Sequence, residues 1–185
     1  IIRQTPLLLQ LMFWYFVGFL GLKDNMLTHI DNIFKVSNQG IELLGLTLSS
    51  EFSALLLGLS IFTSAYIAEV IRGGILSIPR GQWEAFRSLG ITERQGLVSI
   101  IIPQALPSII PGLTSQYLNL AKNSTLAIAV GYSDIYAIND TIINQTGRAI
   151  ECFIILLTSF LLLNLLICNS MEIINKISIN SRTYN

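Results

Sequence analysis

The sequence is poor in charged residues, histidine and cysteine. Only 12% of its 185 residues are charged and the net charge is zero, whereas soluble domains carry about a quarter of charged residues. The single histidine, His29, lies far from both cysteines, and we interpret it as a solvated loop residue rather than a ligand. The sequence has no glycine-rich phosphate loop and no cysteine or histidine pair at metal-binding spacing. We therefore predict no catalytic residue, no metal site, no cofactor bound by this chain and no nucleic-acid partner.

Apolar residues are abundant instead. They make up 52% of the chain, and the mean hydropathy is +0.63. This composition indicates an integral membrane protein, and we expect an all-α, polytopic transmembrane bundle. Four apolar segments predict membrane spans, with an interfacial helix as the alternative for the short first segment. The predicted spans are residues 5–22, 52–71, 105–130 and 150–168.

Polar segments separate these spans and follow the last one. We expect residues 23–50 and 131–149 to be polar loops, and the tail from residue 169 to residue 185 to be a short polar extension. Cys152 and Cys168 fall in the last apolar segment. Sixteen residues of helix would hold them about 24 Å apart, which is too far for a disulfide.

The remaining polar segment, residues 79–103, predicts a helical hairpin. Trp83, Phe86 and Leu89 recur at helical spacing, and Gly90 then suits a left-handed C-cap. Thr92 and Gln95 have the spacing of a capping box, which predicts a second helix that runs to a stop at Pro103. An amphipathic hairpin between two membrane spans indicates a surface that docks on another molecule.

The distribution of positive charge predicts on which side this hairpin lies. If the four spans alternate, seven Lys and Arg residues fall on the side of residues 79–103, and three fall on the other side. The hairpin side collects Arg3, Arg72, Arg80, Arg87, Arg94, Lys176 and Arg182, and the other side has Lys23, Lys35 and Arg148. The positive-inside rule therefore places the hairpin in the cytoplasm. Glu69 and Arg72, three residues apart near the end of a span, predict a structural ion pair.

Three consecutive polar residues interrupt the third apolar segment. Lys122, Asn123 and Ser124 would be costly in lipid, and such groups usually face the interior of a bundle or an aqueous path. The alternatives are snorkelling of Lys122 from near a helix end and satisfaction of irregular backbone. These three residues are our candidates for groups that line a translocation path.

The hairpin also resembles a known family. The stretch has Glu84-Ala85-Phe86, then Gly90 after three residues, and the run from Ile100 to Pro103 after nine more. This spacing matches the EAA motif of permease subunits of bacterial ABC importers. Phe86 and Ile102 replace the alanine and leucine of that motif. Outside the hairpin, four other stretches resemble the polar and general L-amino-acid permeases of the family. They are the entry that begins Arg3-Gln-Thr-Pro-Leu, the segment from Thr63 to Ile75, the segment from Leu118 to Tyr132, and Asn144-Gln-Thr-Gly147.

The resemblance implies a fold, a location and partners. It implies a MetI-like permease fold in the bacterial inner membrane, with residues 23–50 and 131–149 in the periplasm. The implied partners are an ABC ATPase subunit that binds the ATP, a second permease subunit in a homo- or heterodimer, and a periplasmic amino-acid-binding protein. Members of the family carry at least one more helix before this region, so we expect an N-terminally truncated chain.

The resemblance also implies roles for the hairpin residues, which would sit in a cleft of the ATPase. Glu84 would hold the orientation of the hairpin, Gly90 would permit the turn, and Phe86 and Leu89 would supply the buried contact. Ala85, Ile100 and Pro103 complete the predicted coupling set. On the translocation path, Lys122 and the amides would serve the carboxylate and the ammonium of an amino acid.

Other functions stay open at the level of sequence. Within the ABC class, the alternative is a permease for peptides or metal chelates. A secondary transporter or channel would carry ionisable groups through several spans, whereas here they concentrate at span ends and in the hairpin. A third alternative is a membrane scaffold that does not transport and whose hairpin binds another soluble protein.

Overall fold

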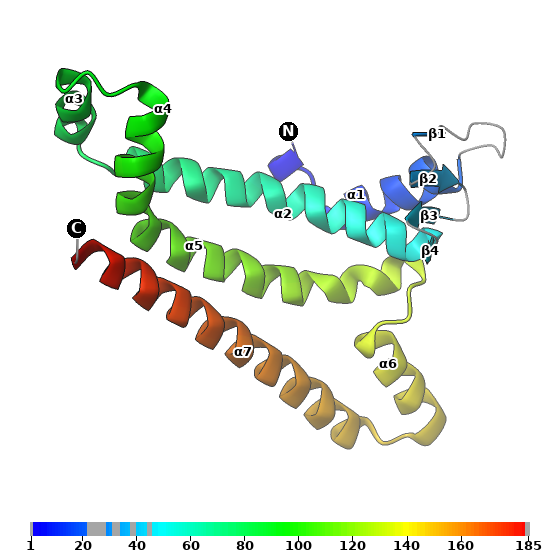
Figure 1. The fold of residues 1–185 in the computed structure, drawn as a ribbon. Helices are drawn as coiled ribbons and strands as arrows, with labels where there is room; N and C mark the ends of the chain where they lie inside the picture. Colours follow the sequence, from blue (N-terminus) through cyan, green and yellow to red (C-terminus); the bar gives the residue numbers. More distant parts are fainter. Residues whose placement is uncertain (1, 22–28, 31–33, 38–39, 44–45, 184–185) are drawn as a thin grey trace. The chain divides into compact units, whose positions relative to one another are not determined.

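Long helices dominate the chain. The computed structural model describes residues 2–21, 29–30, 34–37, 40–43 and 46–183 (Figure 1). Its elements in order are η1 (Ile2–Gln4), α1 (Leu7–Met12), η2 (Phe13–Phe19), β1 (His29–Ile30), β2 (Phe34–Ser37), β3 (Gly40–Leu43), β4 (Leu46–Ser49), α2 (Ser50–Leu76), α3 (Arg80–Ser88), α4 (Glu93–Gly96), η3 (Leu97–Ile101), α5 (Ile102–Asn123), η4 (Ser124–Val130), α6 (Ile135–Thr146) and α7 (Ala149–Thr183). The expected helical membrane architecture is confirmed.

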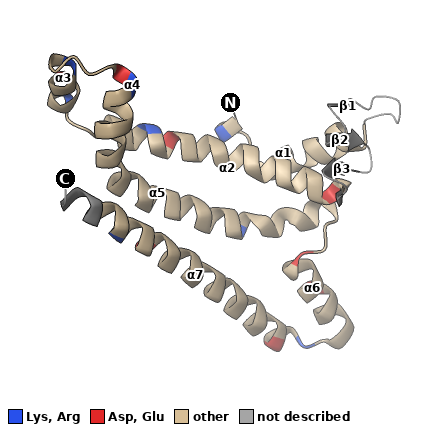
Figure 2. Ribbon diagram, in the orientation of Figure 1, with Lys and Arg blue, Asp and Glu red and all other residues tan. Residues whose placement is uncertain are grey.

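Within the described residues, three helical segments are long and apolar enough to cross a membrane: Ser50–Leu76, Glu93–Val130 and Ala149–Ile179. The first apolar segment gives a shorter helix, Leu7–Phe19, and thirteen residues reach only about 20 Å. The four-span topology remains a prediction. Figure 2 shows that α2, α5 and α7 carry few charged residues along their length, and that charged residues mark the hairpin.

The chain divides into two compact units. The first contains Ile1–Ala65 and Leu120–Leu161. Its core is formed by α1, the beginning of α2, and η4, whose buried residues are Leu7, Leu11, Leu55, Leu59, Ala127 and Val130. Gly58 permits the approach of α1 to α2, because a Cβ there would lie 2.5 Å from Leu11 Cδ2. Small residues allow such close helix contacts in membranes.

The second unit contains Tyr66–Asn119 and Leu162–Asn185. Here α2 and α5 approach each other through two glycines. A Cβ at Gly74 would overlap Ile109 Cγ1, and a Cβ at Gly112 would lie 2.6 Å from Val70 Cγ1. The hairpin formed by α3 and α4 connects these two helices (Figure 1). Close packing of α2 on α5 therefore fixes the base of the hairpin.

The structure corrects four expectations about element boundaries. The second hairpin helix does not stop at Pro103 but continues through η3 into α5. Proline lacks the N–H that an α-helix needs, and the π-type turn η3 lies directly before it, with the Ile102 N–H bonded to the Leu97 carbonyl five residues back. A π-type turn contains one extra residue, which lets the helix continue although Pro103 cannot donate a backbone hydrogen bond.

Two expected loops contain regular structure. In segment 23–50, β1 to β4 form an antiparallel sheet in sequence order, with Phe34 opposite Leu43 and Ile41 opposite Leu48. The prediction that the His29 side chain is solvated lies outside the described residues. In segment 131–149, α6 begins at the Asp134 N-cap, whose carboxylate accepts the Ala137 N–H at 2.8 Å, and ends at Gly147 with φ 70°.

The tail is also helical. Residues expected to form a polar extension after residue 168 continue α7 as far as Thr183. Cys152 and Cys168 are free cysteines on this helix. Only 6% of the most apolar window of α7 is buried within the chain, so nearly all of this helix presents apolar side chains outward. Ile150, Ile155, Leu157 and Leu166 are among those that are more than half exposed.

Candidate functional site

The turn of the hairpin is built from backbone hydrogen bonds around Gly90. Gly90 has φ 73°, a conformation that side chains with a Cβ rarely adopt. The Gly90 N–H donates to the Arg87 carbonyl at 3.0 Å, and the Ile91 N–H donates to the Phe86 carbonyl at 3.2 Å. These two bonds form a Schellman motif, which satisfies the last carbonyls of α3. The predicted glycine C-cap is confirmed.

The second helix of the hairpin starts at Thr92. Its hydroxyl accepts the Gln95 N–H at 3.4 Å and is 2.9 Å from the Gln95 side-chain oxygen. Thr92 is therefore the N-cap of α4, as predicted. In a full capping box the Gln95 side-chain oxygen would accept the Thr92 backbone N–H, whereas here it accepts the Thr92 hydroxyl. Only two residues, Ile91 and Thr92, separate the turn glycine from α4, so the hairpin is tight.

Phe86 is the centre of the hairpin. It is only 1% exposed, and a Cβ on Gly96 would lie 2.5 Å from both Phe86 Cδ2 and Phe86 Cε2. The rings of Trp83 and Phe86 are 5.9 Å apart. The phenyl ring therefore fills the space between α3 and α4 that the missing side chain of Gly96 leaves open. The sequence assigns Phe86 to a contact with a partner, but in the structure its side chain packs inside the hairpin.

An ion pair bridges the two helices on the outside. Arg87 Nε lies 2.7 Å from Glu93 Oε1, and both side chains are exposed. This hydrogen bond to Glu93 raises the pKa of Arg87 further above its ordinary value. Exposed pairs of this kind contribute little to stability. A second connection joins α3 to α5, where the Gln104 side-chain amide donates to the Gln82 side-chain oxygen at 3.3 Å.

Several predicted coupling residues present their side chains on the surface. Leu89 is 77% exposed although it is fully apolar. Glu84, Ala85 and Pro103 are also exposed, and Ile100 is half-buried. Its neighbour Ile101 is fully buried instead. The hairpin thus keeps Phe86 and Ile101 inside and presents the Leu89 side chain and the Glu84 carboxylate outside.

The candidate path residues lie where α5 changes into η4. Lys122 is exposed, and Asn123 and Ser124 are half-buried. The Ser124 hydroxyl donates to the Ala121 carbonyl at 2.8 Å, and the Thr125 hydroxyl donates to the Lys122 carbonyl at 2.8 Å. These two hydroxyls satisfy carbonyls at the change of helix type. These bonds support the structural role of this junction, and the path role of Lys122, Asn123 and Ser124 stays a prediction.

The predicted ion pair near the end of α2 is present. The Arg72 guanidinium bonds to both carboxylate oxygens of Glu69, with Arg72 Nε at 3.1 Å from Glu69 Oε2. The sequence alone does not mark Gly74, Gly96 and Gly112 as the glycines at which helices pack closely. Each of these glycines is identified by the side chain of another helix that packs against it. A local sequence pattern does not show which helices pack together.

The hairpin, its motif spacing and the apolar helices define a class of membrane transport protein. Residues 1–177 match the family of binding-protein-dependent transport system inner membrane components. The chain belongs to this family.

Relatives within the family resemble the chain over much of its length. The general L-amino acid transport system permease protein AapQ of Rhizobium johnstonii is 52% identical over 107 residues, which cover 58% of this chain and 27% of the relative. The glutamate/glutamine/aspartate/asparagine transport system permease protein BztB of Rhodobacter capsulatus is 44% identical over 133 residues, which cover 71% of this chain and 31% of the relative. The chain spans about a third of the length of these curated relatives.

Solved structures share the fold. The crystal structure of an amino acid ABC transporter with histidines superposes with a TM-score of 0.70 at 30% identity, and covers 95% of this chain and 71% of the solved chain. The inward-facing MetNI methionine ABC transporter superposes with a TM-score of 0.68 at 20% identity, and covers 96% of this chain and 70% of the solved chain. The expected MetI-like fold is confirmed.

Proposed function

We propose that this chain is a permease subunit of a binding-protein-dependent ABC importer that moves L-amino acids into the cytoplasm. The observation that carries the proposal is the exposed hairpin, whose turn at Gly90 and motif spacing are those of the family to which the chain belongs. The names of the relatives AapQ and BztB and of the solved amino acid transporter support amino acids as the substrate class.

The proposed partners follow from this function. The permease lies in the bacterial inner membrane, where a second permease subunit completes the pathway. An ABC ATPase subunit binds ATP and the hairpin, and a periplasmic amino-acid-binding protein delivers the substrate. Leu89 inserts into the ATPase, and Glu84 orients the hairpin there. Phe86 sets the distance between α3 and α4 rather than touching the partner, because it is buried against Gly96.

Transport then follows from movement of the hairpins. ATP binding closes two ATPase subunits, which brings the two hairpins of a permease pair together and switches the spans between inward and outward states. We keep Lys122, Asn123 and Ser124 as proposed contacts of the substrate, with the lysine ammonium facing the carboxylate of the amino acid.

Co-purification with a co-expressed ABC ATPase in detergent tests the coupling. Glu84→Ala removes an exposed carboxylate, and Gly90→Pro forces φ to about −65° at a residue that needs 73°. We expect wild type to retain the ATPase and both variants to lose it. Glu151→Ala and Gly81→Ala are matched controls, because Glu151 is an exposed glutamate on α7 and a Cβ at Gly81 meets nothing within 4 Å. Equal retention by all variants would contradict the docking role.

Transport itself is tested with the complete transporter in proteoliposomes. With the binding protein on one side and ATP on the other, we expect uptake of L-amino acids that stops when ATP is withdrawn. Uptake of peptides or metal chelates in place of amino acids would favour the alternative within the ABC class. ATP-independent uptake driven by an ion gradient would favour a secondary transporter.

A further inference from the structure

The hairpin is joined to α2 and to α5 in two different ways. On one side, a short connection from Ser77 to Pro79 links the end of α2 to the start of α3 (Figure 1). On the other side, α4 continues through η3 into α5 as one helical segment. A movement of α4 is therefore passed directly to α5, whereas α3 moves with them only if its side chains are held.

The first hairpin helix, α3, is held to this continuous segment at two places. Near the turn, the Phe86 ring packs against Gly96, where a Cβ would lie 2.5 Å from two ring carbons. At the base of the hairpin, the Gln104 side-chain amide donates to the Gln82 side-chain oxygen at 3.3 Å. Gln82 precedes Phe86 by four residues, so both side chains lie on the same face of α3, about one turn apart.

Two separate contacts have a mechanical consequence. The packing of the Phe86 ring against Gly96 is apolar and has little directionality, so this contact alone would leave α3 free to rotate about it. The hydrogen bond is directional, and it joins the first turn of α3 to the first turn of α5. With both contacts in place, α3 and the start of α5 move as a single body.

The chemistry of the glutamine contact differs from that of the ion pair between the two hairpin helices. Arg87 and Glu93 are charged and exposed, and added salt weakens such a pair. Gln82 and Gln104 are neutral amides, so neither salt nor pH removes the charge on which their attraction depends. The contact at the base of the hairpin is thus the one that persists at every salt concentration.

We propose that Gln82 and Gln104 are positioning residues for the coupling of ATP hydrolysis to transport. Their hydrogen bond makes α3 move with α5, so that a displacement of the docked hairpin by the ATPase reaches α5 in full. The inference rests on the proposed function, and it assigns neither glutamine to the contact with the ATPase. Without the bond, α3 rotates on Phe86, part of the displacement is lost, and fewer amino acids are transported for each ATP hydrolysed.

The test measures amino-acid uptake and ATP hydrolysis in the same proteoliposomes with the complete transporter. In Gln82→Ala and Gln104→Ala we expect the ATPase to be retained and ATP hydrolysis to continue. The number of amino acids transported per ATP should fall by about two- to tenfold, which is the effect of one neutral hydrogen bond on an equilibrium. The double variant should lose no more than either single variant, because both changes remove the same bond. Gln145→Ala, at an exposed glutamine of α6, should leave the ratio unchanged.

Two further measurements separate positioning from a purely structural role. Gln82→Glu together with Gln104→Lys replaces the amide contact by an ion pair, and it should restore most of the ratio at low salt but less at high salt. Gln82→Cys with Gln104→Cys, in a Cys152→Ala, Cys168→Ala background that takes up amino acids, allows a cleavable bifunctional thiol reagent to fix α3 to α5. We expect uptake to continue while this link is intact, because the two helices move together.

The outcomes distinguish this inference from the proposed function. An unchanged ratio in both alanine variants would overturn the inference. So would a loss of uptake on cross-linking that cleavage reverses, because α3 and α5 would then have to separate during transport. Loss of the ATPase from Gln82→Ala would show instead that Gln82 contacts the partner. In all three cases, uptake by wild type leaves the proposed function intact. If wild type takes up no amino acid with ATP present, the proposed function fails, and this inference fails with it.

Discussion

The ring of Phe86 and the backbone of Gly96 fit together so closely that a Cβ at residue 96 would come within 2.5 Å of two ring carbons. The larger residue in the motif is thus matched by the absence of a side chain on the facing helix. This pairing accounts for the phenylalanine that replaces alanine at this position. It also makes the two residues energetically dependent on each other.

The first prediction concerns this dependence. Gly96→Ala forces the Phe86 ring out of its position, and we expect it to destabilise the hairpin by about 1–3 kcal/mol, as overpacking usually does. Phe86→Ala leaves a cavity and destabilises the hairpin as well. In the double variant the new methyl group occupies part of that cavity, so its loss should be smaller than the sum of the two single losses. Hydrogen exchange of residues 80–101 in detergent measures the loss of stability in the two single variants and the double variant. Additive losses would contradict the contact between Phe86 and Gly96.

The second prediction separates the shape of the hairpin from its surface. Leu89 is 77% exposed, so Leu89→Ala should leave hydrogen exchange of the hairpin unchanged while it reduces retention of the ATPase. Phe86→Ala should reduce both. Leu157→Ala, at a similarly exposed leucine of α7, is the control for loss of an outward apolar side chain. An effect of Leu89→Ala on exchange but not on retention would reverse these two roles.

The third prediction uses two adjacent glycines of α2. A Cβ at Gly74 would overlap Ile109 on α5, whereas a Cβ at Gly73 meets nothing within 4 Å. Gly73→Ala should therefore stabilise the protein by up to about 1 kcal/mol through helix propensity. Gly74→Ala should destabilise it by about 1–3 kcal/mol through overpacking, less the same propensity gain. Thermal unfolding in detergent compares the two, and shifts of equal sign would contradict the close packing of α2 and α5.

The fourth prediction concerns the exposed ion pair of the hairpin. The hydrogen bond that Arg87 donates to Glu93 raises the pKa of Arg87, so the stabilisation linked to Arg87 is fully present below its unfolded pKa. It is lost only when the pH rises through the still higher folded pKa. Arginine stays protonated at every pH used for proteins. Glu93→Gln should therefore change retention of the ATPase only slightly, and the change should decrease with added salt. Because Arg87 stays charged, it should not make this change depend on pH between pH 6 and about 9. Retention of the ATPase at two salt concentrations is the measurement, and a large effect independent of salt would show that Glu93 contacts the partner.

Local signals in the sequence predicted local structure well. Gly90 is of the residue type that favours a helix C-terminus, and Thr92 is of the type that favours an N-cap. In the structure α3 ends before Gly90 and α4 begins after Thr92. The same signals exist at Asp134 and Gly147, which bound α6. There the several polar residues between the two signals favour a loop, although the segment is helical in the structure.

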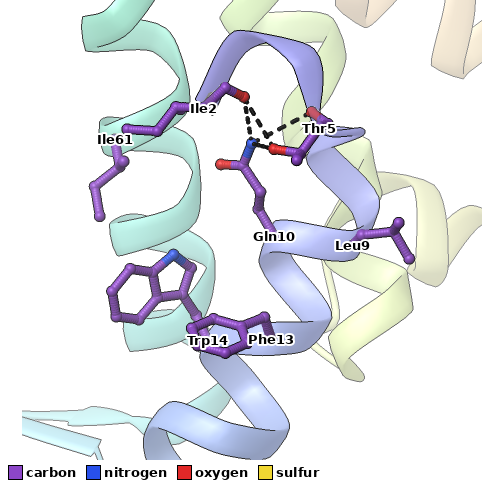
Figure 3. Close-up of a pocket in the computed structure, with 7 residues that line it drawn as sticks. All are labelled: Ile2, Thr5, Leu9, Gln10, Phe13, Trp14 and Ile61. Carbon is purple, nitrogen blue, oxygen red and sulfur yellow. Dashed lines mark hydrogen bonds between the residues drawn. The ribbon is translucent and has the colours of Figure 1, made fainter.

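Signals that depend on context were harder to interpret. Pro103 and the asparagine-rich tail favour a break in isolation, but the chain continues as helix at both. The pairs Phe86 with Gly96, Gly74 with Ile109 and Gly112 with Val70 depend on the packing of one helix against another. A surface hollow lined by both Ile2 and Ile61 (Figure 3) likewise needs two segments that are distant in sequence to meet. No periodicity along a single segment contains that information.

The outward apolar surface of α7 has a thermodynamic consequence. With 6% of its most apolar window buried, this helix gains almost none of its stability from contacts within the chain. Its folding free energy is therefore mainly a transfer free energy from water to hydrocarbon, and it depends on the thickness and composition of the surrounding amphiphile. A melting temperature of this protein is accordingly a property of the protein and its lipid or detergent together, and values from two different detergents describe two different equilibria.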